Sequence, residues 1–217
     1  MKILLISSSP RKKSSQTFAL AKEVVKGFGS SAKTEVIHLC DYKIEFCRHC
    51  EACHKKIMSC PIKDDVNSIL KKALSADGII LATPNYINQI TASMKALLER
   101  ASHFIHCKRL LEKYIVGVVS SGSGYDQDVL NYIRHYAHTC GAQYSGGISS
   151  RASDLNEKIG KARQLGKKFF QDIKNKKEYS DQIKIIEEGK AYFKKIIQLR
   201  KNEWREEYKY WQEKNWL

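Results

Sequence analysis

Four of the seven cysteines lie in one short stretch of the sequence, CRHCEACHKKIMSC, at Cys47, Cys50, Cys53 and Cys60. The first three thiols fall so close together that the backbone must curl if they are to reach one centre. This compact spacing is typical of thiolates that hold three corners of a cuboidal [4Fe–4S] cluster, and the fourth cysteine can take the last corner. The stretch therefore predicts an iron–sulfur centre, whose chemistry is electron transfer.

Three other interpretations of these cysteines stay open from the residues alone. Zinc is a weaker match, because it more often takes two separated Cys-x₂-Cys pairs. A disulfide framework needs an oxidising compartment, and nothing marks the chain as secreted. The thiols could also stand without a metal. His49 and His54 lie in the same stretch, and because four thiols already satisfy four corners, we expect both imidazoles to face solvent.

The composition indicates one domain with a helical appendage. The 217 residues are 42% hydrophobic, which is enough for a sizeable core. No window approaches the roughly 20 apolar residues that cross a bilayer, and the apolar run after Met1 is too short for a signal peptide. Clustered cysteines without an export signal predict a cytoplasmic protein.

The formal charge of +15 comes mostly from lysines and arginines on segments with a helical pattern. We interpret it as solvated basic helix faces, with attraction of anionic cofactors as the next interpretation. Because no nucleic-acid motif accompanies the charge, we expect neither a nucleic-acid nor a membrane partner.

A second site for chemistry follows the first predicted strand, residues 2–7. The loop SSSPRKKSSQT, residues 7–17, leads into a helix predicted over 16–28. Free N–H groups at a helix start attract anions, and the loop adds hydroxyls and the charge of Arg11. A phosphate monoester is the ligand that these groups favour, although a capped loop without a ligand would have a similar sequence. The Gly-Lys-Ser/Thr ending of a Walker loop is absent.

Four further apolar runs complete a regular alternation of strands and helices. Strands are predicted at 33–39, 77–83, 113–120 and 142–149, and helices at 64–74, 93–103, 127–140 and 154–174. Five strands alternating with helices predict a flavodoxin-like α/β fold, a doubly wound parallel sheet with strand order 2-1-3-4-5. At the start of the second helix we expect Asp64 and Asp65 to act as capping residues rather than as a catalytic pair.

Ligands of such sheets bind beyond the carboxyl ends of the strands, where the strand order reverses. The serine-rich loop, the loop PNYINQITAS at 84–93 and the loop SSGSGYDQ at 120–127 all meet there. The cysteine stretch follows the neighbouring strand, so we expect it beside the same edge. The histidines show no nucleophile–base spacing, and we predict no catalytic side chain.

Residues 1–178 are thus the predicted core domain, and residues 179–217 a helical extension. An apolar stripe along one long helix or two shorter ones predicts either packing on the core or a subunit interface; it comprises Phe193, Ile197, Trp204, Tyr208 and Trp211.

The sequence resembles a known family at these motifs. SSSPRKKSSQT is similar to the phosphate loop of NADPH-dependent FMN reductase-like flavoproteins, and ATPNYINQITASMKALLER to their flavin-ring loop and following helix. With the pattern C-x₂-C-x₂-C-x₆-C and the following PIKDDV, residues 1–175 resemble the iron–sulfur flavoproteins of anaerobic prokaryotes.

The resemblance implies roles for individual residues. The FMN phosphate would be held by Ser9, Arg11, Ser15, Gln16 and Thr17. The isoalloxazine would be lined by Pro84, Asn85, Tyr86 and Ile87, and on the other side by Ser121, Gly122 and Gly124. A [4Fe–4S] cluster would be ligated by Cys47, Cys50, Cys53 and Cys60.

The implied activity is an FMN-dependent oxidoreductase that passes electrons between a hydride donor such as NAD(P)H, FMN and the cluster. A protein such as ferredoxin could be donor or acceptor, and a homo-oligomer, dimer or tetramer, is expected. The alternatives are a cluster-free NAD(P)H-dependent FMN or quinone reductase, and a non-catalytic electron carrier or redox sensor.

Overall fold

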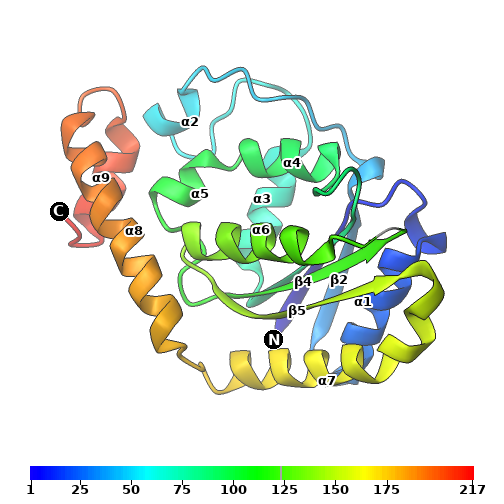
Figure 1. The fold of residues 1–217 in the computed structure, drawn as a ribbon. Helices are drawn as coiled ribbons and strands as arrows, with labels where there is room; N and C mark the ends of the chain where they lie inside the picture. The colour runs from blue at the N-terminus through cyan, green and yellow to red at the C-terminus, as the bar shows by residue number, and fades with distance from the viewer. Residues whose placement is uncertain (123) are drawn as a thin grey trace.

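The computed structural model describes residues 1–122 and 124–217, and its centre is a five-stranded, all-parallel sheet (Figure 1). The order across the sheet is β2-β1-β3-β4-β5, which confirms the predicted flavodoxin-like order. The strands are β1 (Lys2–Ser7), β2 (Lys33–His38), β3 (Gly78–Pro84), β4 (Tyr114–Ser121) and β5 (Gln143–Arg151). β3 and β4 are buried along their whole length, as continuous apolar runs in a central parallel strand require.

Helices cover both faces of the sheet, because successive side chains of each strand point to opposite faces. On β1, Ile3 and Leu5 pack with one helix layer, and Leu4 and Ile6 with the other. The first layer is α1 (Gln16–Lys26) and α7 (Leu155–Lys174). The second is α3 (Val66–Ser75), α4 (Ala92–Glu99), α5 (Ser102–His106) and α6 (Asp126–Thr139). Short 3₁₀ turns lie at Lys12–Ser14, Gly29–Ser31, Leu39–Asp41 and Ala152–Asp154.

A pair of glycines allows α1 and α7 to approach closely. A Cβ at Gly166 would lie 1.8 Å from the carbonyl oxygen of Val24, and one at Gly27 would lie 2.2 Å from that of Arg163. Both distances are far below any van der Waals contact, so the backbones touch at this crossing only because neither residue has a side chain. The close packing of α1 against α7 thus requires glycine at these two positions.

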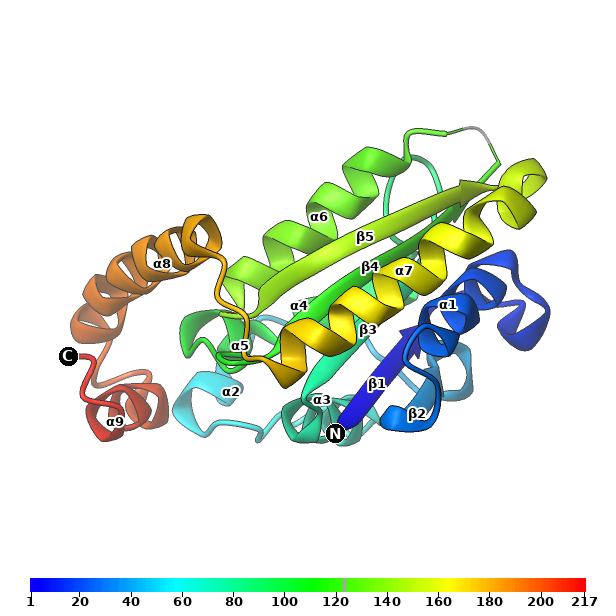
Figure 2. The ribbon, with the colours of Figure 1, turned by 90° about the horizontal axis from the view of Figure 1, so that it is seen from below.

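Two helices form the C-terminal extension, α8 (Ser180–Leu199) and α9 (Arg205–Glu213). Figure 2 shows them beyond the sheet, on the side of α5 and of the short helix α2 (Ala52–Lys55). Cys107, Ile197, Trp204 and Trp211 form a small core of their own there. The extension therefore packs against the core domain. Among the described helices, none is both long and apolar enough to cross a bilayer.

The helix predictions differ from the structure in two places. The segment predicted as one helix over 93–103 is divided into α4 and α5 around Arg100 and Ala101. The cysteine stretch, for which no helix was predicted, contains α2, whose single turn carries Cys53.

Candidate functional site

All four cysteines of the stretch, Cys47, Cys50, Cys53 and Cys60, line one cavity of about 570 Å³. Cys47 and Cys50 are exposed, whereas Cys60 and Cys53, which lies on α2, are half-buried. The other three cysteines lie elsewhere; Cys40 is exposed, and Cys107 and Cys140 are buried. The four thiols that the spacing grouped therefore line the same cavity.

Polar groups from outside the loop point at the cysteine sulfurs. Arg100 Nη2 donates to Cys60 Sγ at 3.2 Å, and Ser102 Oγ lies 3.5 Å from Cys53 Sγ. Within the loop, the N–H of His49 donates to Cys47 Sγ at 3.4 Å. Such contacts stabilise negative charge on sulfur, and hydrogen bonds to the sulfurs help to set the potential of a cluster. The donor set of this cavity therefore fits four metal-bound thiolates.

Asp64 differs in role from the predicted helix cap. Its side chain is only 1% exposed and accepts from Arg100 Nη1 at 2.7 Å and Nη2 at 3.1 Å. Burial by itself would raise the pKa of Asp64, but the hydrogen bonds from Arg100 and from two backbone N–H groups outweigh it and lower that pKa. One of these N–H groups, that of Val66, opens α3, so a weak capping contact remains at 3.3 Å. Asp65, at the N-cap position, makes no side-chain cap.

His54 is the second correction, because it does not face solvent. The residue is 5% exposed, and its Nδ1 donates to Glu207 Oε1 at 2.7 Å, while its Nε2 lies 3.9 Å from Cys53 Sγ. Burial opposes the charged imidazole, yet the contacts with Cys53 and Glu207 raise the pKa of His54 to about 10. Burial likewise disfavours the Cys53 thiolate, but the hydrogen bonds with His54 and Ser102 lower the pKa of that thiol. His49, by contrast, is exposed as predicted.

A second cavity, of about 140 Å³, lies at the carboxyl ends of the strands, where the three loops were expected to meet. Its lining includes seven of the predicted flavin-site residues: Arg11, Gln16, Pro84, Asn85, Tyr86, Ser121 and Gly122. Ser120 and Ala152 complete it, and neither was predicted. Because enclosed ligand pockets measure roughly 300–1,000 Å³, a flavin held here would keep part of its ring exposed.

Asn85 gives this cavity a specific hydrogen-bonding group. Its Nδ2 donates to the carbonyl of Gly124 at 2.7 Å, and its backbone N–H donates to Ser120 at 2.7 Å. Its Oδ1 is buried and has no partner among the described residues. A buried acceptor without a donor costs free energy, which a ligand N–H at this position would recover. The isoalloxazine ring of FMN carries one such imide N–H, so the residues present fit that cofactor.

The remaining predicted residues lie around this cavity rather than in its lining. Ser15 caps α1, since its Oγ accepts from Phe18 N at 3.1 Å and donates to the Lys12 carbonyl at 2.8 Å. The Thr17 hydroxyl is bonded to that of Ser120, which ties the first loop to the end of β4. Ser9 is buried, and Ile87 is 98% exposed. Ser15 and Thr17 thus shape the loop, and their hydroxyls already have protein partners. In the loop 120–127, Ser123 lies outside the described residues.

The two cavities lie at opposite ends of α4. The loop of Pro84 and Asn85 precedes this helix, and Arg100 of the cysteine cavity directly follows it. At 1.5 Å per residue, the segment 91–100 spans about 14 Å. Figures 1 and 2 both show α2 beside α5 and α9, away from the strand ends toward which the arrows point. The expectation that the cysteine loop lies beside the flavin edge is therefore wrong. The loop between β2 and α3 is long enough to reach the other end of α4. There it is held by contacts with Arg100 and Glu207.

Comparisons with known proteins identify the family of the chain. Residues 1–154 match the NADPH-dependent FMN reductase family. The chain belongs to that family. It is 34% identical to an iron–sulfur flavoprotein of Methanocaldococcus jannaschii over 80% of this chain and 98% of that protein. An iron–sulfur flavoprotein of Archaeoglobus fulgidus is 27% identical over the whole of both chains.

Solved structures of flavin proteins share the fold. The complex of RosB with 8-demethyl-8-formylriboflavin-5′-phosphate matches with a TM-score of 0.63 at 16% identity, over 87% of this chain and 81% of that one. The apo form of the NADH:FMN oxidoreductase EMOB matches with a TM-score of 0.57 at 21% identity, over 76% and 88%. The chain is thus an iron–sulfur flavoprotein by family, and the family supports FMN as its cofactor and oxidoreduction as its reaction.

Proposed function

We propose that this protein is an FMN-dependent oxidoreductase that passes electrons between a hydride donor such as NAD(P)H, FMN and a [4Fe–4S] cluster. The observation that carries the proposal is the shared cavity of Cys47, Cys50, Cys53 and Cys60 in a chain of a flavoprotein family. When bound, FMN takes two electrons as a hydride and releases them singly, and the cluster relays single electrons.

The protein's own part at the flavin cavity is binding and orientation. Arg11 is exposed at the cavity and would attract the FMN phosphate, and Gln16 lies beside it at the start of α1. Asn85 would accept the ring N–H through Oδ1, with its orientation fixed by its bond to Gly124. Pro84, Tyr86 and Ile87 would line one side of the ring, and Ser121, Gly122 and Gly124 the other.

At the cysteine cavity the protein supplies four thiolates and cationic neighbours. Arg48, Arg100 and Arg200 line the cavity, against Glu51 and Glu99. A cluster bound by four thiolates is an anion, so the nearby guanidinium groups would stabilise it.

Because the two cavities lie at opposite ends of α4, we also propose that electrons pass from the flavin of one copy to the cluster of another. This requires a homo-oligomer, either a dimer or a tetramer. A small protein such as ferredoxin is the proposed external donor or acceptor, since its own cluster exchanges single electrons.

Anaerobic mixing with NADPH or NADH tests the activity. Rapid bleaching of the flavin, followed by reduction of the cluster, supports the proposal. A protein that consumes NAD(P)H without any iron would instead be a cluster-free reductase. A protein that is reduced by ferredoxin but never by NAD(P)H would be an electron carrier.

Replacing Arg11 tests the flavin cavity separately. Arg11→Ala should weaken FMN affinity by about tenfold or more, because it removes a charged contact to a phosphate. Lys13→Ala is the matched control, since Lys13 is an exposed cation of the same loop outside the cavity lining. Equal affinities of the two variants would remove Arg11 from the phosphate site.

A further inference from the structure

The C-terminal extension contacts the cysteine loop through Arg200 and two carboxylates, Glu206 and Glu207. The Glu51 carboxylate accepts from Arg200 Nη1 at 2.9 Å and Nη2 at 2.7 Å, and the N–H of Ile57 donates to Glu206. Between them, His54 Nδ1 donates to Glu207. These contacts fall three residues apart along 51–57, the turn that contains Cys53. The extension therefore holds the part of the loop that lines the cysteine cavity.

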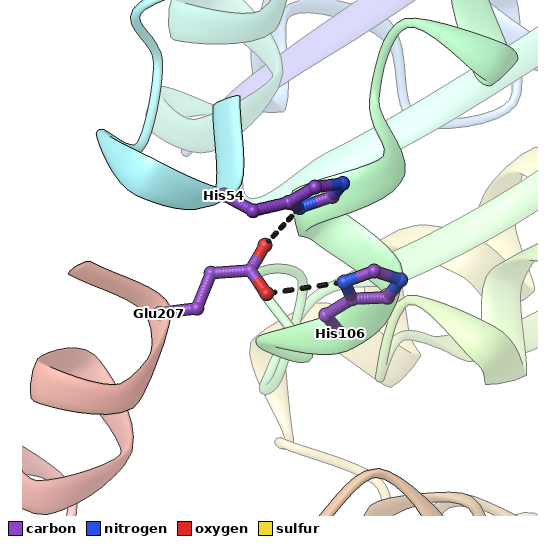
Figure 3. Close-up of side chains that lie close together, drawn as sticks. All are labelled: His54, His106 and Glu207. Carbon is purple, nitrogen blue, oxygen red and sulfur yellow. Dashed lines mark hydrogen bonds and ion pairs between the residues drawn. The ribbon is translucent and has the colours of Figure 1, made fainter. Parts of the chain in front are cut away.

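Glu207 is the central contact of the three (Figure 3). Its side chain is 0% exposed, and each carboxylate oxygen lies within hydrogen-bonding distance of one histidine ring nitrogen. Oε1 accepts from His54 Nδ1 at 2.7 Å, and Oε2 lies 3.1 Å from His106 Nδ1. The two imidazoles come from α2 and α5, so one side chain from α9 joins three helices.

The two rings lie face to face. His54 and His106 stack with centroids 4.7 Å apart and planes 20° from parallel. The indole of Trp204 stacks on His106 at 4.7 Å and lies tilted against His54 at 4.6 Å. With both Nδ1 atoms at Glu207, the Nε2 atoms point together to the opposite side (Figure 3). On that side His54 Nε2 meets Cys53 Sγ at 3.9 Å.

This arrangement does not suit a metal ion between the three side chains, although their ligand atoms lie within 4.8 Å of one another. An imidazole binds a metal through a lone pair in the plane of its ring, at about 2.1 Å. Two nearly parallel rings stacked 4.7 Å apart cannot direct both lone pairs at one ion. A carboxylate with two oxygens, each facing one ring nitrogen, does suit them.

We propose that Glu207 is a positioning residue of the cysteine centre: it fixes the ring orientations of His54 and His106, and through His54 it holds the turn of Cys53 and keeps the His54 ring beside the Cys53 sulfur. Trp204 packs against both rings. The role at the sulfur rests on the proposed function, because it requires a cluster at these thiols; the contact that holds the turn does not.

The test compares three variants of the full-length protein. Glu207→Gln keeps the size of the side chain but offers one acceptor oxygen instead of two. Glu213→Gln is the control for the helix, since Glu213 is an exposed carboxylate of α9. Glu99→Gln is the control for charge, because Glu99 also lies at the cavity and its ion pair is with Lys95 of its own helix.

Hydrogen exchange of peptide 51–57 is the first measurement. We expect exchange about tenfold to a hundredfold faster in Glu207→Gln than in Glu213→Gln, as the loss of a charged hydrogen bond implies. Equal exchange in these two variants would overturn the proposal. If Glu207→Gln does not fold, Glu207→Asp gives the same comparison, since the shorter side chain cannot reach both rings.

The reduction potential of the cluster is the second measurement. If Glu207 only stabilised the fold, the potential would not depend on it. The His54 ring lies 3.9 Å from the Cys53 sulfur, and the surroundings of the ligand sulfurs help to set the potential of a cluster, so a less well held ring shifts the potential. We expect the potential of Glu207→Gln to differ from that of Glu99→Gln, which has lost the same charge. Equal potentials would refute the role at the sulfur, and a stoichiometric zinc ion lost only in Glu207→Gln would refute the argument against a metal. If the unmodified protein holds no cluster, the proposed function fails, and the exchange data still decide whether Glu207 holds the turn.

Discussion

Arg100 contacts Asp64 and Cys60 with the same guanidinium group. Its Nη2 lies 3.1 Å from Asp64 Oδ1 and 3.2 Å from Cys60 Sγ, and its Nη1 also donates to the carbonyl of Glu45. The end of α4 is thereby joined to both ends of the cysteine loop. The ion pair is 1% exposed on each side, so the structure of the loop depends on a pair that is removed from water.

Replacing Asp64 should therefore be costly. Asp64→Asn leaves the buried Arg100 without its counter-charge, and we expect a loss of about 3–5 kcal/mol in the free energy of unfolding. Urea denaturation measures it. Glu35→Gln, which breaks the exposed Lys72–Glu35 pair, is the control and should cost at most about 1 kcal/mol. Similar losses in the two variants would contradict the structural role of Asp64.

The crossing of α1 and α7 gives a prediction with a control on the same helix. Gly166→Ala places a Cβ against the Val24 carbonyl and should destabilise the protein by about 1–3 kcal/mol or more. Gly160→Ala meets no atom within 4 Å and should stabilise it by about 0.5–1 kcal/mol, the usual gain in an exposed helix. Thermal unfolding of both variants checks the sign, and a stable Gly166→Ala protein would show that the helices do not cross here.

His103 predicts a dependence of stability on pH. It is 1% exposed, and burial, with Arg109 nearby, lowers its pKa to about 4 from the usual 6.5. Between these values the unfolded chain binds the proton and the folded chain does not, so stability is lost as the pH falls from 6.5 to 4. The loss reaches about 3 kcal/mol.

Urea denaturation across this pH range separates His103 from other groups. His103→Gln should reduce the slope of stability against pH, whereas His135→Gln, at an exposed position of α6, should leave it unchanged. An unchanged slope in His103→Gln would mean that His103 is not held neutral.

Iron content distinguishes the four cavity cysteines from the others. We expect Cys53→Ser to lose most of its iron on anaerobic purification, because one corner of the cluster lacks its thiolate. Cys40→Ser should keep it, since Cys40 lies outside the cavity. Equal iron in both variants would contradict the assignment of ligands.

The sheet could be predicted from the sequence because each strand is a local pattern. The apolar runs at 77–83 and 113–120 predicted buried parallel strands, which are β3 and β4, and alternation with helices then leaves few strand orders. The four cysteines were grouped for the same reason, since their spacing is short. The positions of Ile87 and Thr17 relative to a flavin could not be predicted in this way, because they depend on the geometry of loops.

Contacts across long separations could not be predicted. Glu207 and His54 are far apart in the sequence, and neither residue has a local pattern that would identify the other. We expected His54 to face solvent because four thiols already fill the four corners of a cluster. The position of α9, which buries His54, could not be predicted from the sequence. The predicted location of the cysteine stretch, beside the flavin edge, was wrong for a similar reason. The end of β2 fixes where the loop begins, whereas Arg100 and Glu207 determine where it lies.

Cofactor stoichiometry on anaerobically purified protein shows whether the chain holds both a [4Fe–4S] cluster and FMN. Iron, acid-labile sulfide, zinc and FMN are measured per chain, together with the absorption spectrum. We expect about four iron and four sulfide, with one FMN, per chain. One zinc with no acid-labile sulfide, or no FMN after reconstitution, would contradict this expectation.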